Sequence, residues 1–169
     1  MKNLPLLLCF ITLLLSSCGS KQLIVKKNTA AQLSKELGFH VSHKDDLRLY
    51  TEAVKWLGTP YKYGGNTLAG VDCSGLVHNI YKTVYDIHLE RKAEDIYKKN
   101  CRKIPTNSLM PGDLVFFDTK NNRRKVNHMG IYLKDKVFLH ASSSRGVVLN
   151  KMDEKYYRKS LVKGGRVKK

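Results

Sequence analysis

Residues 58–77 read GTPYKYGGNTLAGVDCSGLV, a glycine-rich loop that leads directly into a helix. Pro60 and the glycines at 58, 64, 65 and 70 favour several unusual backbone angles, so residues 58–72 are not expected to continue a regular helix or strand. From Ser74 to Val84, apolar residues recur at three- and four-residue spacing, which predicts an amphipathic helix. The sequence therefore predicts that Cys73 lies in the first turn of a helix.

Around this stretch, predicted helices come before predicted strands. Asp46 can cap a helix over residues 47–57, which Gly58 would close, and a further helical segment is expected over residues 90–99. Bounded apolar runs predict strands at residues 113–117, 128–133, 137–141, 146–149 and 165–167. Helices followed by an antiparallel sheet indicate an α+β domain.

The amino terminus has the pattern of a secretory signal. Residues 1–17 contain Lys2, an apolar run from Leu4 to Leu15 and two serines, and Cys18 follows. The run is shorter than the roughly 20 residues of a membrane-spanning helix. Its ending, Leu-Ser-Ser-Cys, resembles a bacterial lipobox, which implies cleavage before Cys18 and acylation of Cys18, with palmitate among the acyl chains. Ordinary cleavage beside an unmodified Cys18 is the alternative.

Three segments follow from this pattern. We expect a signal peptide at residues 1–17, a lipidated amino terminus and tether at residues 18–45, and the folded domain at residues 46–169. Within the tether, residues 30–37 are suited to a short amphipathic helix. No separate wall-binding or SH3-like module is expected, because few residues precede the folded domain.

The composition indicates one packed core and a strongly basic surface. Hydrophobic residues make up 42% of the 169 residues, which argues against a disordered chain. The formal net charge is +17, and removal of residues 1–17, with one lysine and no acid, leaves +16. An exported chain meets little nucleic acid, so we expect anionic polymers or lipids of the envelope as partners and no nucleic acid. A merely solvated basic surface is the alternative.

Cys73 is the strongest candidate for a chemical role. The first turn of a helix presents free backbone N–H groups and the positive end of the helix dipole, both of which favour thiolate over thiol. The sequence therefore predicts a lowered pKa and a nucleophile, with a nearby N–H as oxyanion donor. A small buried core cysteine is the alternative. Cys101 is expected to be a bystander thiol.

A nucleophilic cysteine needs a base, and two histidines occupy adjacent predicted strands. His128 and His140 are twelve residues apart, and the middle of the interval falls in the predicted turn. An odd loop would place them opposite or diagonal on one face of the hairpin, whereas an even loop would need a bulge. We expect His128 to accept the thiol proton and His140 to orient the imidazole of His128. Structural histidines are the alternative.

Four ordered blocks carry a more specific resemblance: GTPYKYGGNTLAGVDCSGLV, LMPGDLVFF, NHMGIYL and FLHASSSRGVVL. In this order and spacing the chain resembles the NlpC-type cell-wall peptidases of the papain-like superfamily, over about residues 46–167. The resemblance implies a papain-like α+β fold in which the helix carrying the nucleophile packs on a central antiparallel sheet. It also implies that Cys73, His128 and His140 are the nucleophile, the base and the third catalytic member.

The same resemblance implies residues that contact the substrate. Tyr61 would line the site near the tetrahedral intermediate, with Tyr63 as the alternative for this role. Asp72 and Ser74 would hold the amino end of the substrate, and Asp72 is also suited to cap the following helix. The resemblance implies no metal, no other cofactor and a monomeric protein.

The activity implied is that of a lipid-anchored cysteine endopeptidase that cuts peptidoglycan stems, at the bond between γ-D-glutamate and diaminopimelate. Some relatives instead cut the D,D cross-link between stems. Three competing hypotheses are a basic envelope-binding lipoprotein without turnover, a muramoyl amidase and a lipid acyltransferase. By analogy, the anchor at Cys18 would place the protein on the outer membrane facing the periplasm, and any regulatory partner is unidentified.

Overall fold

The computed structural model describes residues 17–121 and 125–168, in two compact units divided after Leu47. The expected signal peptide therefore lies outside the described residues except for Ser17. The first unit consists mainly of α2, Ser17–Leu37. The helix α2 is closed by Gly38, whose φ is +72° and whose N–H donates to the carbonyl oxygen of Ser34 at 3.0 Å.

The helix predicted over residues 30–37 is thus confirmed as the last part of α2. The residues of α2 before it, which the sequence assigns to a tether, are helical as well. Among the described residues, no helix combines the length and the apolar character needed to cross a membrane.

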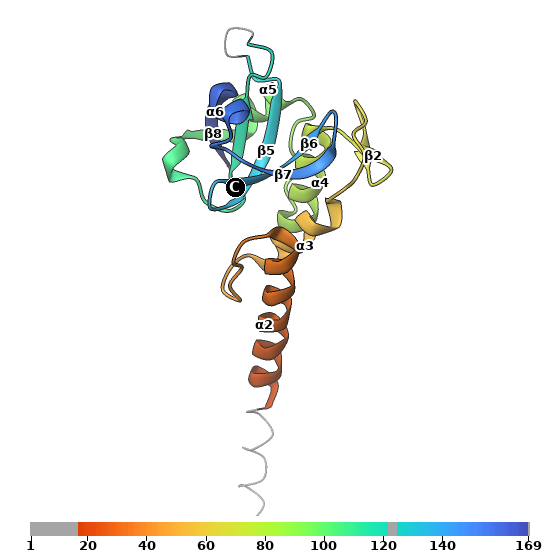
Figure 1. The fold of residues 1–169 in the computed structure, drawn as a ribbon, viewed down its shortest axis with the longest axis vertical. Coiled ribbons are helices and arrows are strands. Elements are labelled where there is room, and N and C mark those ends of the chain that lie inside the picture. The colour runs from red at the N-terminus through yellow and green to blue at the C-terminus, as the bar shows by residue number, and fades with distance from the viewer. Residues whose placement is uncertain (1–16, 122–124, 169) are drawn as a thin grey trace, which may run out of the picture. The chain divides into compact units, whose positions relative to one another are not determined.

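The second unit begins with two helices that the sequence predicts. The first is α3, Leu47–Trp56, which buries four large or apolar side chains and is followed by Gly58 at a φ of +78°. The other is α4, Cys73–Tyr85, which packs against the central sheet (Figure 1). The carboxylate of Asp72 caps α4 by accepting a hydrogen bond from the N–H of Gly75 at 2.7 Å.

Six antiparallel strands form the central sheet, in the order β3-β8-β4-β5-β6-β7. Their bounds are Cys101–Ile104 (β3), Leu114–Phe117 (β4), His128–Lys134 (β5), Val137–Ser142 (β6), Gly146–Lys151 (β7) and Leu161–Val167 (β8). A two-stranded ribbon in the glycine-rich loop joins β1, Asn66–Thr67, to β2, Gly70–Val71. The α+β fold class is confirmed.

Short helical segments complete the second unit. They are α5, Ala93–Asp95, the π-helical Ile96–Asn100, the 3₁₀ turn Thr106–Ser108 and α6, Lys155–Ser160. The prediction of a single helix over residues 90–99 is wrong for its first residues. Glu90 and Arg91 are not helical, because the N–H of Glu90 donates to Asn100 Oδ1 at 2.9 Å and Arg91 contacts the start of α4.

The hairpin of β5 and β6 has a loop with an even number of residues and the bulge expected from the sequence for such a loop. Only Asp135 and Lys136 lie between the strands, both at positive φ, which is typical of a two-residue turn. The even loop is compensated by an irregularity in the register between Tyr132 and Lys134.

This register decides where the two histidines lie. Ile131 pairs with Leu139, so continuing the ladder places Gly130 opposite His140 and His128 two positions further along, on the same face. A Cβ at position 130 would lie 2.5 Å from the carbonyl oxygen of Leu139 and 3.1 Å from the Cβ of His140. Glycine at this position therefore lets the two histidines approach each other diagonally.

Aromatic side chains cover the face of the sheet that carries the histidines. The rings of Phe117, Phe138 and Tyr157 pack on one another at centroid distances of 4.9 to 5.5 Å. Phe138 also stacks on His140 at 4.9 Å. Tyr157 comes from α6, which the sequence did not predict, so part of this packing comes from an element outside the recognised motifs.

Candidate active site

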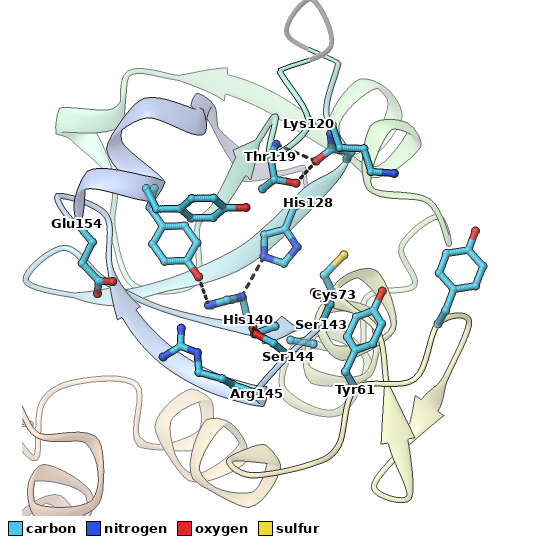
Figure 2. A pocket seen from close by; sticks show the side chains of 16 residues that line it. Tyr61, Cys73, Thr119, Lys120, His128, His140, Ser143, Ser144, Arg145 and Glu154 are labelled. Atoms are coloured by element: carbon cyan, nitrogen blue, oxygen red, sulfur yellow. Dashed lines mark hydrogen bonds between the residues drawn. The ribbon is translucent and has the colours of Figure 1, made fainter.

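Cys73 is the first residue of α4 and lies between two adjoining cavities. One, of about 560 Å³, is lined by Cys73, Tyr61, His128 and His140, among others. The other, of about 580 Å³, shares Tyr61, Tyr63, Cys73 and Asn127 with the first. The cleft therefore continues on both sides of the thiol. Figure 2 shows the sulfur of Cys73 projecting into the first cavity beside the imidazole of His128.

The thiol of Cys73 is held in its neutral form. Burial and, less strongly, the charge of Asp72 raise its pKa to about 11, although backbone N–H groups at Met129, Ser74 and Cys73 act in the opposite direction. The lowered pKa predicted from the helix start is thus wrong. The expected backbone donors are present, but the loss of solvent outweighs them.

The two histidines are directly coupled. Nε2 of His128 lies 2.9 Å from Nδ1 of His140, and the rings are nearly perpendicular at 87° (Figure 2). Burial and, less strongly, the neighbouring His140 lower the pKa of His128 to about 3. Burial also lowers the pKa of His140 to about 4, although its hydrogen bond to Asn150 opposes the shift. Both imidazoles are therefore neutral near pH 7.

Both candidate tyrosines line the two cavities with Cys73, but Tyr61 is held more firmly. Tyr61 is partly buried and forms an isolated bridge with Val71, beside Asp72. Burial and the charge of Cys73 raise the pKa of Tyr61, so its hydroxyl keeps its proton. The side chain of Tyr63 is 89% exposed, which leaves it less able to hold a fixed position near the sulfur.

The carboxylate of Asp72 is fully engaged within the protein. Arg91 donates to both of its oxygens at 2.8 Å, from Nη1 and Nη2, and the N–H of Gly64 donates to Oδ2 at 2.9 Å. Ser74 Oγ accepts from Arg91 at 2.7 Å and donates to Asp72 Oδ1 at 3.1 Å. Burial raises the pKa of Asp72, but the hydrogen bonds from Arg91 and Gly75 outweigh burial and hold this pKa below its usual value.

Arg91 is a site residue that the sequence reasoning missed. It precedes α5, outside all four motif blocks, and no local pattern marks it as a partner of Asp72. The helix-cap interpretation of Asp72 is confirmed. Its binding of a substrate amine stays a prediction, and a substrate would have to share Asp72 and Ser74 with the guanidinium of Arg91.

The remaining cysteine of the folded unit, Cys101, and the histidines His78 and His88 have structural surroundings. Cys101 is buried on β3 without a disulfide, and burial raises its pKa to about 12. His78 Nδ1 lies 3.0 Å from the carbonyl oxygen of Leu89, and its ring contacts His88 at 6.1 Å. Within residues 17–121 and 125–168, no cluster of three or more His, Cys, Asp or Glu side chains is arranged to hold a metal ion.

A cysteine at a helix start that faces two coupled histidines on an antiparallel sheet defines the class of papain-like α+β proteins with a Cys–His–His site. The family model described as NlpC/P60 matches residues 58–166. The chain therefore belongs to the NlpC/P60 family. A solved structure of an NlpC/P60 family protein from Bacillus cereus superposes with a TM-score of 0.67 and 26% identity, over 73% of this chain and 40% of that one.

Curated relatives include the "Probable endopeptidase NlpC homolog" of Haemophilus influenzae, which is 37% identical over 67% of this chain and 58% of its own length. The "Murein DD-endopeptidase MepS/Murein LD-carboxypeptidase" of Escherichia coli is 32% identical over 71% of this chain and 62% of its own length. The "Gamma-DL-glutamyl hydrolase" of Bacillus subtilis is 36% identical over 64% of this chain and 26% of its own length. The chain thus spans less than two thirds of these relatives.

Proposed function

We propose that this chain is a peptidoglycan endopeptidase that uses Cys73 as nucleophile, His128 as base and His140 as third catalytic member. The observation that carries the proposal is the coupled pair of histidines in the same cavity as the helix-start thiol. The names of the relatives, which include an endopeptidase acting on murein, support the same class of reaction.

The protonation states suggest how the first step proceeds. With a neutral thiol and a neutral imidazole, the sulfur attacks the amide carbonyl while its proton moves to a ring nitrogen of His128. Backbone N–H groups at the start of α4 and the hydroxyl of Tyr61 are placed to stabilise the oxyanion. The imidazolium of His128 then protonates the leaving amine, and water hydrolyses the thioester.

For the bond cleaved, we propose the γ-D-glutamyl–diaminopimelate bond. The γ-glutamyl specificity in the name of the B. subtilis relative supports this choice, whereas the name of MepS supports the D,D cross-link as the alternative. The net charge of +17 favours contact with a polymer rich in carboxylates.

Defined muropeptides incubated with the purified full chain test the activity, with products identified by mass spectrometry. We expect a fragment that begins with diaminopimelate, lost in Cys73→Ala and kept in the matched control Cys101→Ala. Conversion of cross-linked dimers to monomers would instead assign a D,D-endopeptidase. If no product depends on Cys73, the hydrolase proposal is wrong and a binding lipoprotein becomes the better interpretation.

We further propose that Cys18 carries the lipid anchor and that the protein resides on the outer membrane facing the periplasm. The support is the apolar run that ends in Leu-Ser-Ser-Cys. Metabolic labelling with an alkyne analogue of palmitate tests the anchor. Wild type and Cys101→Ala should incorporate the label and Cys18→Ala should not; a label retained in Cys18→Ala would contradict this assignment. Separation of inner and outer membranes then tests the location.

A further inference from the structure

A second set of polar side chains lies behind His140 and has no part in the steps above. Nε2 of His140 lies 3.0 Å from Oδ1 of Asn150 and 3.1 Å from the hydroxyl of Tyr157. Asn150 lies on β7, the neighbour of the strand that carries His140, and Tyr157 lies on α6. His140 is only 1% exposed, so these two side chains fix its far ring nitrogen in the absence of bulk water.

The amide of Asn150 can take only one orientation. Its Nδ2 group donates to both carboxylate oxygens of Glu154, at 3.0 and 2.8 Å. Its Oδ1 accepts from Nη2 of Arg145 at 2.7 Å. A carboxylate can only accept hydrogen bonds and a guanidinium can only donate them, so exchanging the oxygen and nitrogen of the amide would leave both neighbours facing the wrong partner. Oδ1 therefore faces His140.

This orientation sets the position of the proton on His140. Because Oδ1 of Asn150 can only accept, Nε2 of His140 must carry the hydrogen of the neutral ring. The hydroxyl of Tyr157 can donate or accept, so it is compatible with either tautomer and does not decide between them. Nδ1 of His140 is then an unprotonated acceptor.

The same reasoning continues to His128. Since Nδ1 of His140 accepts, the 2.9 Å hydrogen bond requires the hydrogen of His128 to be on Nε2. Nδ1 of His128 is then unprotonated, and Figure 2 shows this ring nitrogen on the side of the ring toward Cys73. The opposite tautomers would point an N–H at the thiol and leave no lone pair to receive its proton.

We propose that Asn150, held between Glu154 and Arg145, is a positioning residue that sets the tautomers of both histidines and keeps Nδ1 of His128 free to accept the proton of Cys73. Its catalytic consequence rests on the proposed peptidase function. The tautomers themselves do not, and they can be measured without substrate.

Long-range ¹H–¹⁵N NMR of the imidazoles in the ¹⁵N-labelled full chain at pH 7 tests the assignment. We expect both His128 and His140 to be protonated on Nε2. Asn150→Leu should give a mixture of tautomers, whereas the matched control Tyr157→Phe should keep the wild-type tautomer. Protonation on Nδ1 in the wild type would overturn the proposal, as would an unchanged tautomer in Asn150→Leu. The wild-type spectrum needs no variant, so the test stands even if Asn150→Leu does not fold.

Turnover of the muropeptide adds a kinetic readout. Asn150→Leu should lower kcat on the order of 100-fold with little change in KM, because a wrong tautomer removes the base and leaves binding intact. Asn150→Asp combined with Glu154→Gln retains an acceptor toward His140 and a donor at position 154, and this double variant should restore most of kcat. Equal losses in both variants would contradict the role of the acceptor. A wild type without turnover on any muropeptide would refute the peptidase proposal and leave the NMR result to decide this one.

Discussion

Lowering the pH from 7 to 5 should destabilise this protein through its two coupled histidines. The pKa of His128 in the folded state is about 3 and that of His140 about 4, against about 6.5 for an unfolded chain. Because the pKa values are lowered on folding, the unfolded chain binds protons at these histidines between about pH 6.5 and 4, whereas the folded protein does not. The free energy of unfolding is therefore highest above pH 6.5 and decreases as the pH falls toward the folded pKa values.

The size of the loss follows from these pKa values. Below pH 6.5 each histidine contributes a slope that approaches about 1.4 kcal/mol per pH unit. Between pH 7 and 5 each histidine accounts for about 2 kcal/mol, and the two together for about 4 kcal/mol, a large part of an ordinary folding free energy. The pKa of Asp72 is lowered, so its contribution changes only in more acidic solution and does not disturb this window.

Urea unfolding followed by the fluorescence of Trp56, the single tryptophan, measures the effect at pH 7, 6 and 5. In His128→Asn the loss between pH 7 and 5 should shrink by about half, because one of the two titrations is removed. The matched control His43→Asn should keep the full loss. A wild-type loss below about 1 kcal/mol, or an unchanged loss in His128→Asn, would refute the claim that the folded site excludes protons.

Three further perturbations test the site. The rate at which iodoacetamide alkylates Cys73 should keep rising with pH well above neutrality, because the pKa of Cys73 is about 11. The buried Cys101 should react only on unfolding. A Cys73 rate that levels off near pH 7 would show a stabilised thiolate and contradict this. Arg91→Ala should lower the free energy of unfolding by about 2 kcal/mol, because the buried Asp72 loses its ion-pair partner and keeps only its hydrogen bonds from Gly64, Gly75 and Ser74. Arg91→Lys should restore only part of this loss, because one ammonium cannot span both carboxylate oxygens. Equal stability of Arg91→Ala and wild type in urea would contradict this. Gly130→Ala should cause a large loss of muropeptide turnover and a smaller loss of folding stability, because the added methyl group pushes against His140 and the backbone at Leu139. Unchanged turnover would show that the hairpin adjusts freely.

The parts of the site that the sequence predicts are those set by local geometry. The position of Cys73 follows from the capping residue and apolar spacing of one helix, and the relation of His128 to His140 follows from one hairpin, including the irregular register that its even loop requires. The partners of these residues are not local. Arg91 reaches Asp72 from an irregular segment, and Tyr157 reaches His140 from a short helix that no periodicity marks.

The strands also differ in how well the sequence predicts them. The apolar runs at β4, β5 and β6 are buried and their prediction is confirmed, because an internal strand of a covered sheet must be apolar. Edge strand β3 reads Cys-Arg-Lys-Ile, pairs with β8 alone among the described strands, and was missed. Strand β8 begins at Leu161, four residues before its predicted start, and its glycines pack closely against β3 and β4, where a Cβ would lie 2.9 to 3.0 Å from the nearest atoms.

The protonation states and the hydrogen-bond chain together explain how a neutral site can activate its nucleophile. Separating charge between Cys73 and His128 is unfavourable, because burial raises the pKa of Cys73 and lowers that of His128. Backbone N–H groups already face the sulfur, and the tautomers set by Asn150 leave a lone pair ready for its proton. The remaining stabilisation has to come from the substrate, whose carbonyl carbon accepts the electron pair of the sulfur as the proton leaves. Under the proposed peptidase function, such a thiol stays protonated until a bond to be cut lies in the cleft.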